Sequence, residues 1–301
     1  PMQGLWTTWA ENTRPLDFSW KTLIYGPGKQ IISFLLNATI NTLPSQHFLY
    51  LIGRADSPKC RLCNGESYVS HFLAGCKPTL YNGKYAWRHD SVLLTLQPKL
   101  IKQIEDQNKN KIVIAPYAPL SSSFVSSDTS SKQTHTKKQP GRNLLSDAKD
   151  MLIDFDHTPI IFPSHICITD QRPDIIIWSN TLKMVLLVEL TCPADENIAA
   201  ANIRKMARYL PLGALIEANE WKYKIIPIEV GARGFVARSM NYFLRNIGFT
   251  PNASSALCKS VSLTVAQCSV HIWHQRHHRK WSKRPLIAPQ TLDETNSNGS
   301  D

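Results

Sequence analysis

Three cysteines and one histidine fall within residues 60–76, and their spacing restricts how this segment can fold. Cys60, Cys63, His71 and Cys76 form the pattern C-x2-C-x7-H-x4-C. The close cysteine pair allows two thiolates to bind one tetrahedral ion, and the second pair completes four ligands. Sulfur and imidazole ligands favour zinc over magnesium or calcium. Because protein residues fill all four positions, the pattern predicts a structural zinc site rather than a catalytic one.

The other cysteines and the charge balance narrow the class of protein. The 301-residue chain has seven cysteines, an odd number with most outside the cluster, which argues against a secreted disulfide framework and for a reducing, intracellular compartment. No apolar run approaches the ~20 residues of a membrane span, so no membrane partner is expected. The formal net charge of +11 suits a polyanion, most often nucleic acid. The alternative is a basic protein whose charges are only solvated.

Changes in composition along the chain predict five segments. We expect a helical region at 1–58, a zinc knuckle with a following helix at 59–104, and a flexible linker at 105–142. The linker prediction rests on a high content of serine, lysine and helix-breaking residues. An α/β domain at 143–285 and a disordered tail at 286–301 complete the chain.

The segment after the linker alternates helix-like and strand-like patterns. The expected helices cover residues 143–154, 195–210 and 260–279, and the strand-like runs cover residues 166–168, 175–178, 184–190 and 223–230. This order of helix, strands, helix and strand predicts an α/β (mixed α+β) fold.

Two acidic residues mark the ends of adjacent strand-like runs. Asp174 precedes one apolar run, Ser179-Asn180 can form a turn, and the next run ends in Glu189. Antiparallel pairing of the two runs brings the carboxylates together, where they could bind Mg²⁺ or Mn²⁺. Such an ion activates water and stabilises charge on a phosphodiester. The alternative is that both charges are solvated, although a glutamate continuing an apolar strand is costly unless it is paired.

A nuclease also needs a cation near the reacting phosphate. The position two residues after Glu189 is Thr191, and a lysine follows in the next expected helix as Lys205. On that helix one face is apolar and is expected to pack: Ala199, Ile203, Met206 and Leu210. A second face carries Asn202, Lys205 and Tyr209. Lys205 could therefore point into the site while the apolar face is buried.

The motifs follow one another in an order that a known family shares. The segments that carry the likeness are Ser33–Ala38, Asn41–Pro44, the cysteine pattern, Trp87–Val92, Arg172–Asp174, Val188–Pro193, Arg204–Tyr209 and Val230–Phe235. Together they resemble the C-terminal region of non-LTR retrotransposon polyproteins of the restriction-like-endonuclease type. The likeness covers roughly residues 20–285, apart from the linker.

The resemblance implies a zinc knuckle beside a PD-(D/E)xK endonuclease domain, with a restriction-endonuclease-like mixed sheet flanked by helices. The family's nuclease nicks target DNA in the nucleus, and the exposed 3′ end primes reverse transcription of the element RNA. Asp174 and Glu189 match the metal-binding acids, and Lys205 matches the displaced lysine. Arg208 stands where the family has a second helix lysine. No Y-x-D-D box occurs, so the reverse transcriptase would lie outside this chain. A catalytically inactive nucleic-acid-binding remnant is the alternative.

Two further sets of residues complete the expected site. An acidic residue on the preceding helix often joins such metal sites, and Asp150 is the candidate, with Asp147 as the alternative. The residues expected to contact nucleic-acid phosphates are Arg204, Arg208, Arg233, Arg276, Arg279 and Lys280. For the C-terminal cations, the alternative is a solvated basic tail.

Overall fold

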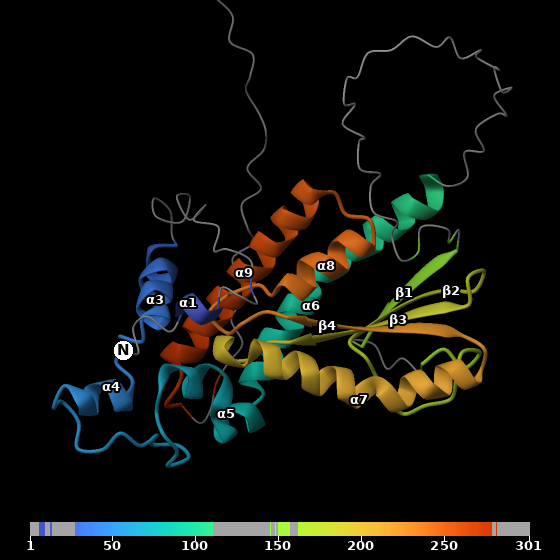
Figure 1. Ribbon diagram of the computed structural model, residues 1–301. Helices are drawn as coiled ribbons and strands as arrows, with labels where there is room; N and C mark the ends of the chain where they lie inside the picture. The colour runs from blue at the N-terminus through green and yellow to red at the C-terminus, as the bar shows by residue number, and fades with distance from the viewer. Residues whose placement is uncertain are drawn as a thin grey trace, which may run out of the picture.

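The computed structural model describes residues 6–9, 13, 28–110, 145, 148, 150–156, 162–278 and 281. Helices flank a four-stranded mixed sheet, which confirms the predicted α/β class (Figure 1). Within the described residues, no helix combines the length and apolar character needed to cross a membrane.

The sheet consists of β1 (Met151–Phe155), β2 (Ile175–Ser179), β3 (Met184–Thr191) and β4 (Lys222–Glu229), in that order. β2 pairs antiparallel with both β1 and β3, and β4 pairs parallel with β3. The predicted hairpin between the two acid-bearing runs is confirmed as β2–β3. The parallel pair needs a crossover connection, which α7 (Ile198–Ala218) supplies.

Helices cover the sheet on both faces and make three layers. Helices α6 (Lys84–Asn110), α8 (Arg238–Asn246) and α9 (Pro251–His274) share a hydrophobic core with one face. The other face packs against α7 through a second core. β3 is therefore buried from both sides, which explains its nearly continuous run of apolar residues. Glu189 is the exception in that run.

The prediction of a helix at 143–154 is wrong for the residues that can be compared. Residues 151–155 form strand β1, whose Met151 pairs with Ser179 of β2. A short apolar run fits either a helix or a strand, and local spacing could not choose between them. The edge of β2 decided the outcome, because a strand placed there satisfies the backbone groups of that edge.

Other element boundaries also differ from the expected ones. α6 continues to Asn110, so residues 105–110 are helical rather than part of a linker. The run at 166–168 forms no strand, and α9 lies at 251–274 rather than 260–279. Residues 111–144, which hold most of the expected linker, lie outside the described part of the chain.

The N-terminal part of the chain forms short helices, and those at residues 29–39 and 71–75 pack on α9. The short helices are α1 (Trp6–Trp9), α3 (Lys29–Thr39), α4 (Gln46–Leu51), η2 (His71–Gly75) and α5 (Lys77–Tyr81). Trp273 of α9 joins them: its ring centroid lies 6.4 Å from that of Phe34 and 5.7 Å from that of Phe72. The cysteine cluster and the sheet layers therefore share α9 as a support.

Candidate metal centre and acidic site

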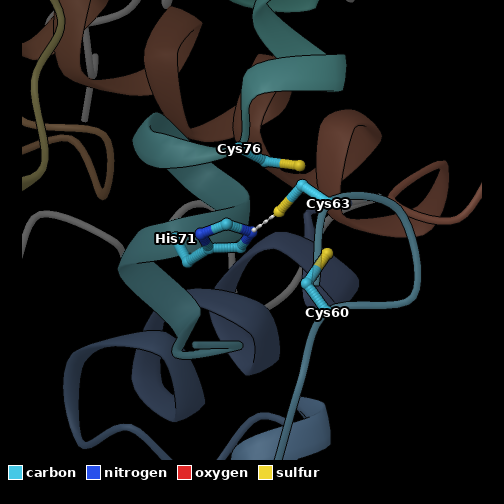
Figure 2. A group of neighbouring side chains, drawn as sticks. All are labelled: Cys60, Cys63, His71 and Cys76. Atoms are coloured by element: carbon cyan, nitrogen blue, oxygen red, sulfur yellow. Dashed lines mark hydrogen bonds between the residues drawn. The ribbon is translucent and has the colours of Figure 1, made fainter. Parts of the chain in front are cut away.

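The four residues of the cysteine pattern converge on one point (Figure 2). The ligand atoms of Cys60, Cys63, His71 and Cys76 all lie within 4.8 Å of one another. Cys63 Sγ is 3.3 Å from His71 Nε2, and Cys60 and Cys76 are buried. This cluster could hold a metal ion such as zinc, with the four predicted ligands.

Local backbone geometry brings the two close cysteines together. The chain turns at Asn64, whose N–H donates to Cys60 O and whose φ is +60°. The chain then runs back beside Cys60, where the Gly65 carbonyl accepts a hydrogen bond from the Cys60 N–H. A Cβ added at position 65 would lie 3.5 Å from Cys63 Sγ. The following helix η2 begins with His71, and Cys76 comes directly after it. Two short segments thus supply two ligands each.

The protonation chemistry of the cluster fits a soft cation. Burial raises the pKa of the Cys60 thiol to about 11, because a thiolate without a cation is poorly solvated there. Burial also lowers the pKa of His71, which favours the neutral imidazole that binds metals. A bound cation would offset the free-energy cost of burying thiolates, because a cysteine that coordinates a metal is deprotonated.

The two predicted acids lie side by side at one end of the β2–β3 hairpin. Ile175 pairs with Val188, so Asp174 and Glu189 flank that pair on adjacent strands. The Asp174 N–H donates to Glu189 Oε2 at 3.3 Å, and the Leu190 N–H donates to Asp174 Oδ2 at 2.7 Å. The residues are only 8% and 4% exposed. Burial and the neighbouring charge of Asp174 raise the pKa of Glu189.

Helix α7 supplies the partners of Glu189. Lys205 donates to Glu189 Oε1, so the lysine reaches the acids from the helix as expected. The Tyr209 hydroxyl donates to Glu189 Oε2 at 2.7 Å and also lies 3.0 Å from Arg172 O. The sequence pattern placed Tyr209 on the same helix face as Lys205 but assigned it no role. Its phenol satisfies a buried carboxylate that would otherwise be costly.

The expected packing face of α7 is wrong. Ile203 and Leu210 are 69% and 53% exposed, and Met206 is also largely outside the core. The helix instead buries Tyr209, Leu212 and other residues against the sheet. Buried Glu189 explains this rotation, because only the face with Lys205 and Tyr209 offers it donors. An apolar stripe in the sequence carried no information about that requirement.

His89 of α6 approaches the acids from the other face of the sheet. Its Nε2 lies 3.2 Å from Asp174 Oδ2, and its Nδ1 lies 3.2 Å from Asp90 Oδ1. Burial lowers the pKa of His89, but the hydrogen bonds to Asp174 and Asp90 outweigh it and raise the pKa to about 11. With both ring nitrogens facing carboxylates, the imidazolium form donates to each. Sequence reasoning missed this residue, although His89 lies in the segment Trp87–Val92.

Asp150 is not part of this site. Its carboxylate accepts from Ser179 Oγ at 2.5 Å and from Thr181 N–H at 2.9 Å, which caps the turn between β2 and β3. That turn is at the opposite end of the hairpin from Asp174. The prediction failed because residues 151–155 are a strand, so the preceding helix in space is α6. Asp147 lies outside the described residues.

The expected phosphate-binding cations separate into different environments. Arg204 and Arg208 are exposed on α7, near Lys205. Arg233 is buried and paired with Asp195 and Glu196, so the prediction that it contacts phosphate is wrong. Arg276 stacks on Trp273, with its guanidinium 4.1 Å from the ring centroid. Arg279 and Lys280 lie outside the described residues.

Comparison with known protein families finds no family model that matches this chain, and no curated protein matches it significantly.

Proposed function

We propose that this chain is a divalent-metal-dependent DNA endonuclease domain of a non-LTR retrotransposon polyprotein. The observation that carries the proposal is the convergence of Asp174, Glu189 and Lys205. Asp174 directly precedes β2, Glu189 lies on β3 and Lys205 lies on α7. Two nearly buried carboxylates with an adjacent lysine form a concentrated site for a hard cation and a phosphate. A purely structural ion pair would need only one of the two acids.

The proposed reaction is hydrolysis of one phosphodiester bond. Mg²⁺ or Mn²⁺ held by the acids would supply an activated water and offset charge on the phosphate. Asp174 and Glu189 would hold the ion through their carboxylate oxygens. Lys205 stabilises the negative charge that develops on the phosphate oxygens. Tyr209 holds Glu189 in place by its hydrogen bond.

The remaining parts of the proposal follow from the same resemblance. Zinc at the cysteine cluster has a structural role, since the four protein ligands complete its coordination. The partners are the DNA target, the element RNA and a reverse transcriptase domain outside this chain, and the site of action is the nucleus. The nick would prime reverse transcription.

A second candidate function is a nucleic-acid-binding module without catalysis. A group of basic side chains beside the cysteine site favours it: Arg61, Arg276, His277 and His278. Lys84 Nζ donates to Gln275 O and His278 O, which brings these segments together. Burial and the nearby charges of Arg276 and Arg61 lower the pKa of His277. Such a cluster attracts phosphates whether or not the acids are active.

Nicking of supercoiled plasmid DNA separates the two candidates. Wild-type protein should nick in Mg²⁺ or Mn²⁺ and not in EDTA, while Asp174→Asn and Glu189→Gln should each lose at least about 100-fold in rate. Both variants keep side-chain size. Asp150→Asn is the matched control, because it removes a carboxylate from the other end of the same hairpin and should nick normally. Wild-type protein that binds DNA but never nicks it would leave only the binding module.

A further inference from the structure

The two oxygens of Asp174 have different surroundings. Oδ2 accepts the Leu190 N–H at 2.7 Å and lies 3.2 Å from His89 Nε2. Among the residues that the structure describes, Oδ1 has no hydrogen-bond partner. Two donors therefore hold one oxygen and leave the other available to an ion.

The position of His89 is itself firmly set. Asp90 Oδ1 lies 3.2 Å from the second ring nitrogen of His89 and so orients the imidazole. The preceding residue, Arg88, is fully buried and donates to Cys192 O at 2.9 Å and to Ser269 Oγ at 3.0 Å. Cys192 directly follows β3, so Arg88 fastens α6 at the level of the acid pair. His89 cannot move far from Asp174 without breaking these contacts.

We propose that His89 is a positioning residue for a divalent ion at the acid pair. By donating to Asp174 Oδ2, it holds the carboxylate so that Oδ1 faces the ion shared with Glu189. Hydrogen bonds to a metal-binding carboxylate restrict its orientation, and losing one costs about 10–100-fold in metal affinity. The inference rests on the proposed metal site.

The geometry argues against His89 as a direct ligand. Its Nε2 is already engaged with Asp174, and its Nδ1 faces Asp90. Within the described residues, three or more ligand atoms lie within 4.8 Å of one another only at the cysteine cluster. His89 therefore acts through the carboxylate and not on the ion.

A matched pair of substitutions tests this role. A glutamine amide can occupy the place of the imidazole Nε2, whereas the shorter asparagine amide reaches only the place of Nδ1. His89→Gln should therefore keep the contact with Asp174, and His89→Asn should keep only the contact with Asp90. Both residues are polar and similar in size, so both variants should fold, with His89→Asn melting lower because it leaves the buried Asp174 with one donor fewer. His165→Asn is the control, because His165 bonds Asn180 near the far turn of the hairpin.

The measurement is the dissociation constant for Mn²⁺, obtained by electron paramagnetic resonance on zinc-loaded protein. His89→Asn should raise it by about 10-fold or more, and His89→Gln should stay within about threefold of wild type. The Mn²⁺ concentration for half-maximal nicking should shift in parallel, with the rate at saturation nearly restored. An unchanged Mn²⁺ affinity in His89→Asn overturns the inference. So does a loss of nicking at saturating Mn²⁺ in that variant, which would give His89 a direct part in the reaction.

The same data separate this inference from the nuclease proposal. Wild-type protein that binds Mn²⁺ but does not nick DNA contradicts the proposed function, and the affinity ratio between the two variants still decides the role of His89. Wild-type protein with no Mn²⁺ site sensitive to Asp174→Asn overturns both.

Discussion

Arg233 and Asp195 form a buried ion pair, with Arg233 Nη1 3.0 Å from Asp195 Oδ2 and side chains only 1% and 0% exposed. Arg233 Nε also donates to Ala38 O at 2.9 Å, just before the end of α3. Gly231 allows this packing, since a Cβ there would lie only 1.9 Å from Asp195 Oδ1. The pair thus joins the N-terminal helices to the loop after β4.

Arg233→Met should therefore destabilise the fold without weakening phosphate contacts. Removing one partner leaves a buried charge uncompensated, which costs about 3–5 kcal/mol. Urea unfolding measures the loss. The control is Arg208→Met on the exposed face of α7, which should change stability by less than about 0.5 kcal/mol. Equal stability of the two variants would show that the Arg233–Asp195 ion pair does not stabilise the fold.

The exposed arginines of α7 should account for part of the salt dependence of DNA binding. Each phosphate contact releases counterions, so Arg204→Gln and Arg208→Gln should each reduce the slope of log affinity against log salt by about 1. Fluorescence anisotropy with a labelled duplex at several salt concentrations gives the slope. Lys183→Gln is the control, because Lys183 lies at the far turn of the sheet beside Glu220. Identical slopes in all variants would place the DNA elsewhere.

Loss of the metal at the cysteine cluster should weaken the whole described fold. Phe72 follows His71 in η2 and packs against Trp273 of α9, so the cluster supports a helix of the main core. Cys63→Ser should release about one zinc per chain and lower the melting temperature in a single transition. Cys167→Ala, at a buried cysteine outside the cluster, should keep its zinc. Full zinc content in Cys63→Ser would exclude this ligand set.

Tyr209→Phe should distinguish the hydrogen bond that holds Glu189 in place from the role of Glu189 in the proposed nicking reaction. The substitution removes the donor to Glu189 and the contact with Arg172 O while keeping the ring in the core. A hydrogen bond to a charged group contributes about 1.5–3 kcal/mol, so unfolding free energy should fall by roughly that amount. Nicking should slow less than in Glu189→Gln, because the carboxylate remains. Stability equal to wild type would mean that Lys205 and the Asp174 N–H satisfy Glu189 without the tyrosine.

Glu229 should make stability depend on pH. Its carboxylate is buried at the end of β4, where Asn202 donates to Oε1 and Ser239 donates to Oε2. Burial raises the pKa of Glu229, so the folded state favours the protonated form. The contribution of Glu229 to stability is therefore fully present below the pKa of glutamate in the unfolded chain, about 4.3. It is lost as pH rises through the higher pKa of Glu229 in the folded state.

Glu229→Gln removes this ionisation and can keep both hydrogen-bonding partners. We expect the variant to match wild type at about pH 4 and to melt a few degrees higher at pH 7–8, where about 1 kcal/mol corresponds to 2–4 °C. Calorimetry across that range measures the difference. A variant that is less stable at pH 7 would show that the ionised carboxylate is well accommodated in the fold.

Local sequence patterns were sufficient for the metal centre and the acid pair. Cys60 and Cys63 are close enough in the chain to share one tight turn, and His71 and Cys76 have the residue types and spacing of a second ligand pair. Asp174 and Glu189 flank a two-strand unit whose turn residues lie between them in the chain. A hairpin brings its own ends together, so no distant contact is needed to predict their proximity.

Contacts between distant segments decided the remaining features. His89 meets Asp174 across 85 residues of chain, and Arg233 meets Asp195 across 38. Neither pairing has a signature in spacing, because it depends on how α6 and the loop after β4 pack on the sheet. The sequence predicts that Arg233 contacts phosphate, whereas the structure buries it in the environment of a core residue.

The orientation of α7 shows the physical reason most directly. The sequence by itself predicted a helix at residues 195–210, with one apolar stripe and one face carrying Lys205 and Tyr209. Only the tertiary structure decided that the second face turns inward and that Ile203 and Leu210 face outward. A buried carboxylate without donors costs several kcal/mol. The inward face of α7 supplies those donors and still buries Tyr209, Leu212 and Ile216 against the sheet. Helix periodicity in the sequence shows where the apolar residues lie. Glu189 requires hydrogen-bond donors only once helices cover β3, and the sequence pattern does not show that requirement.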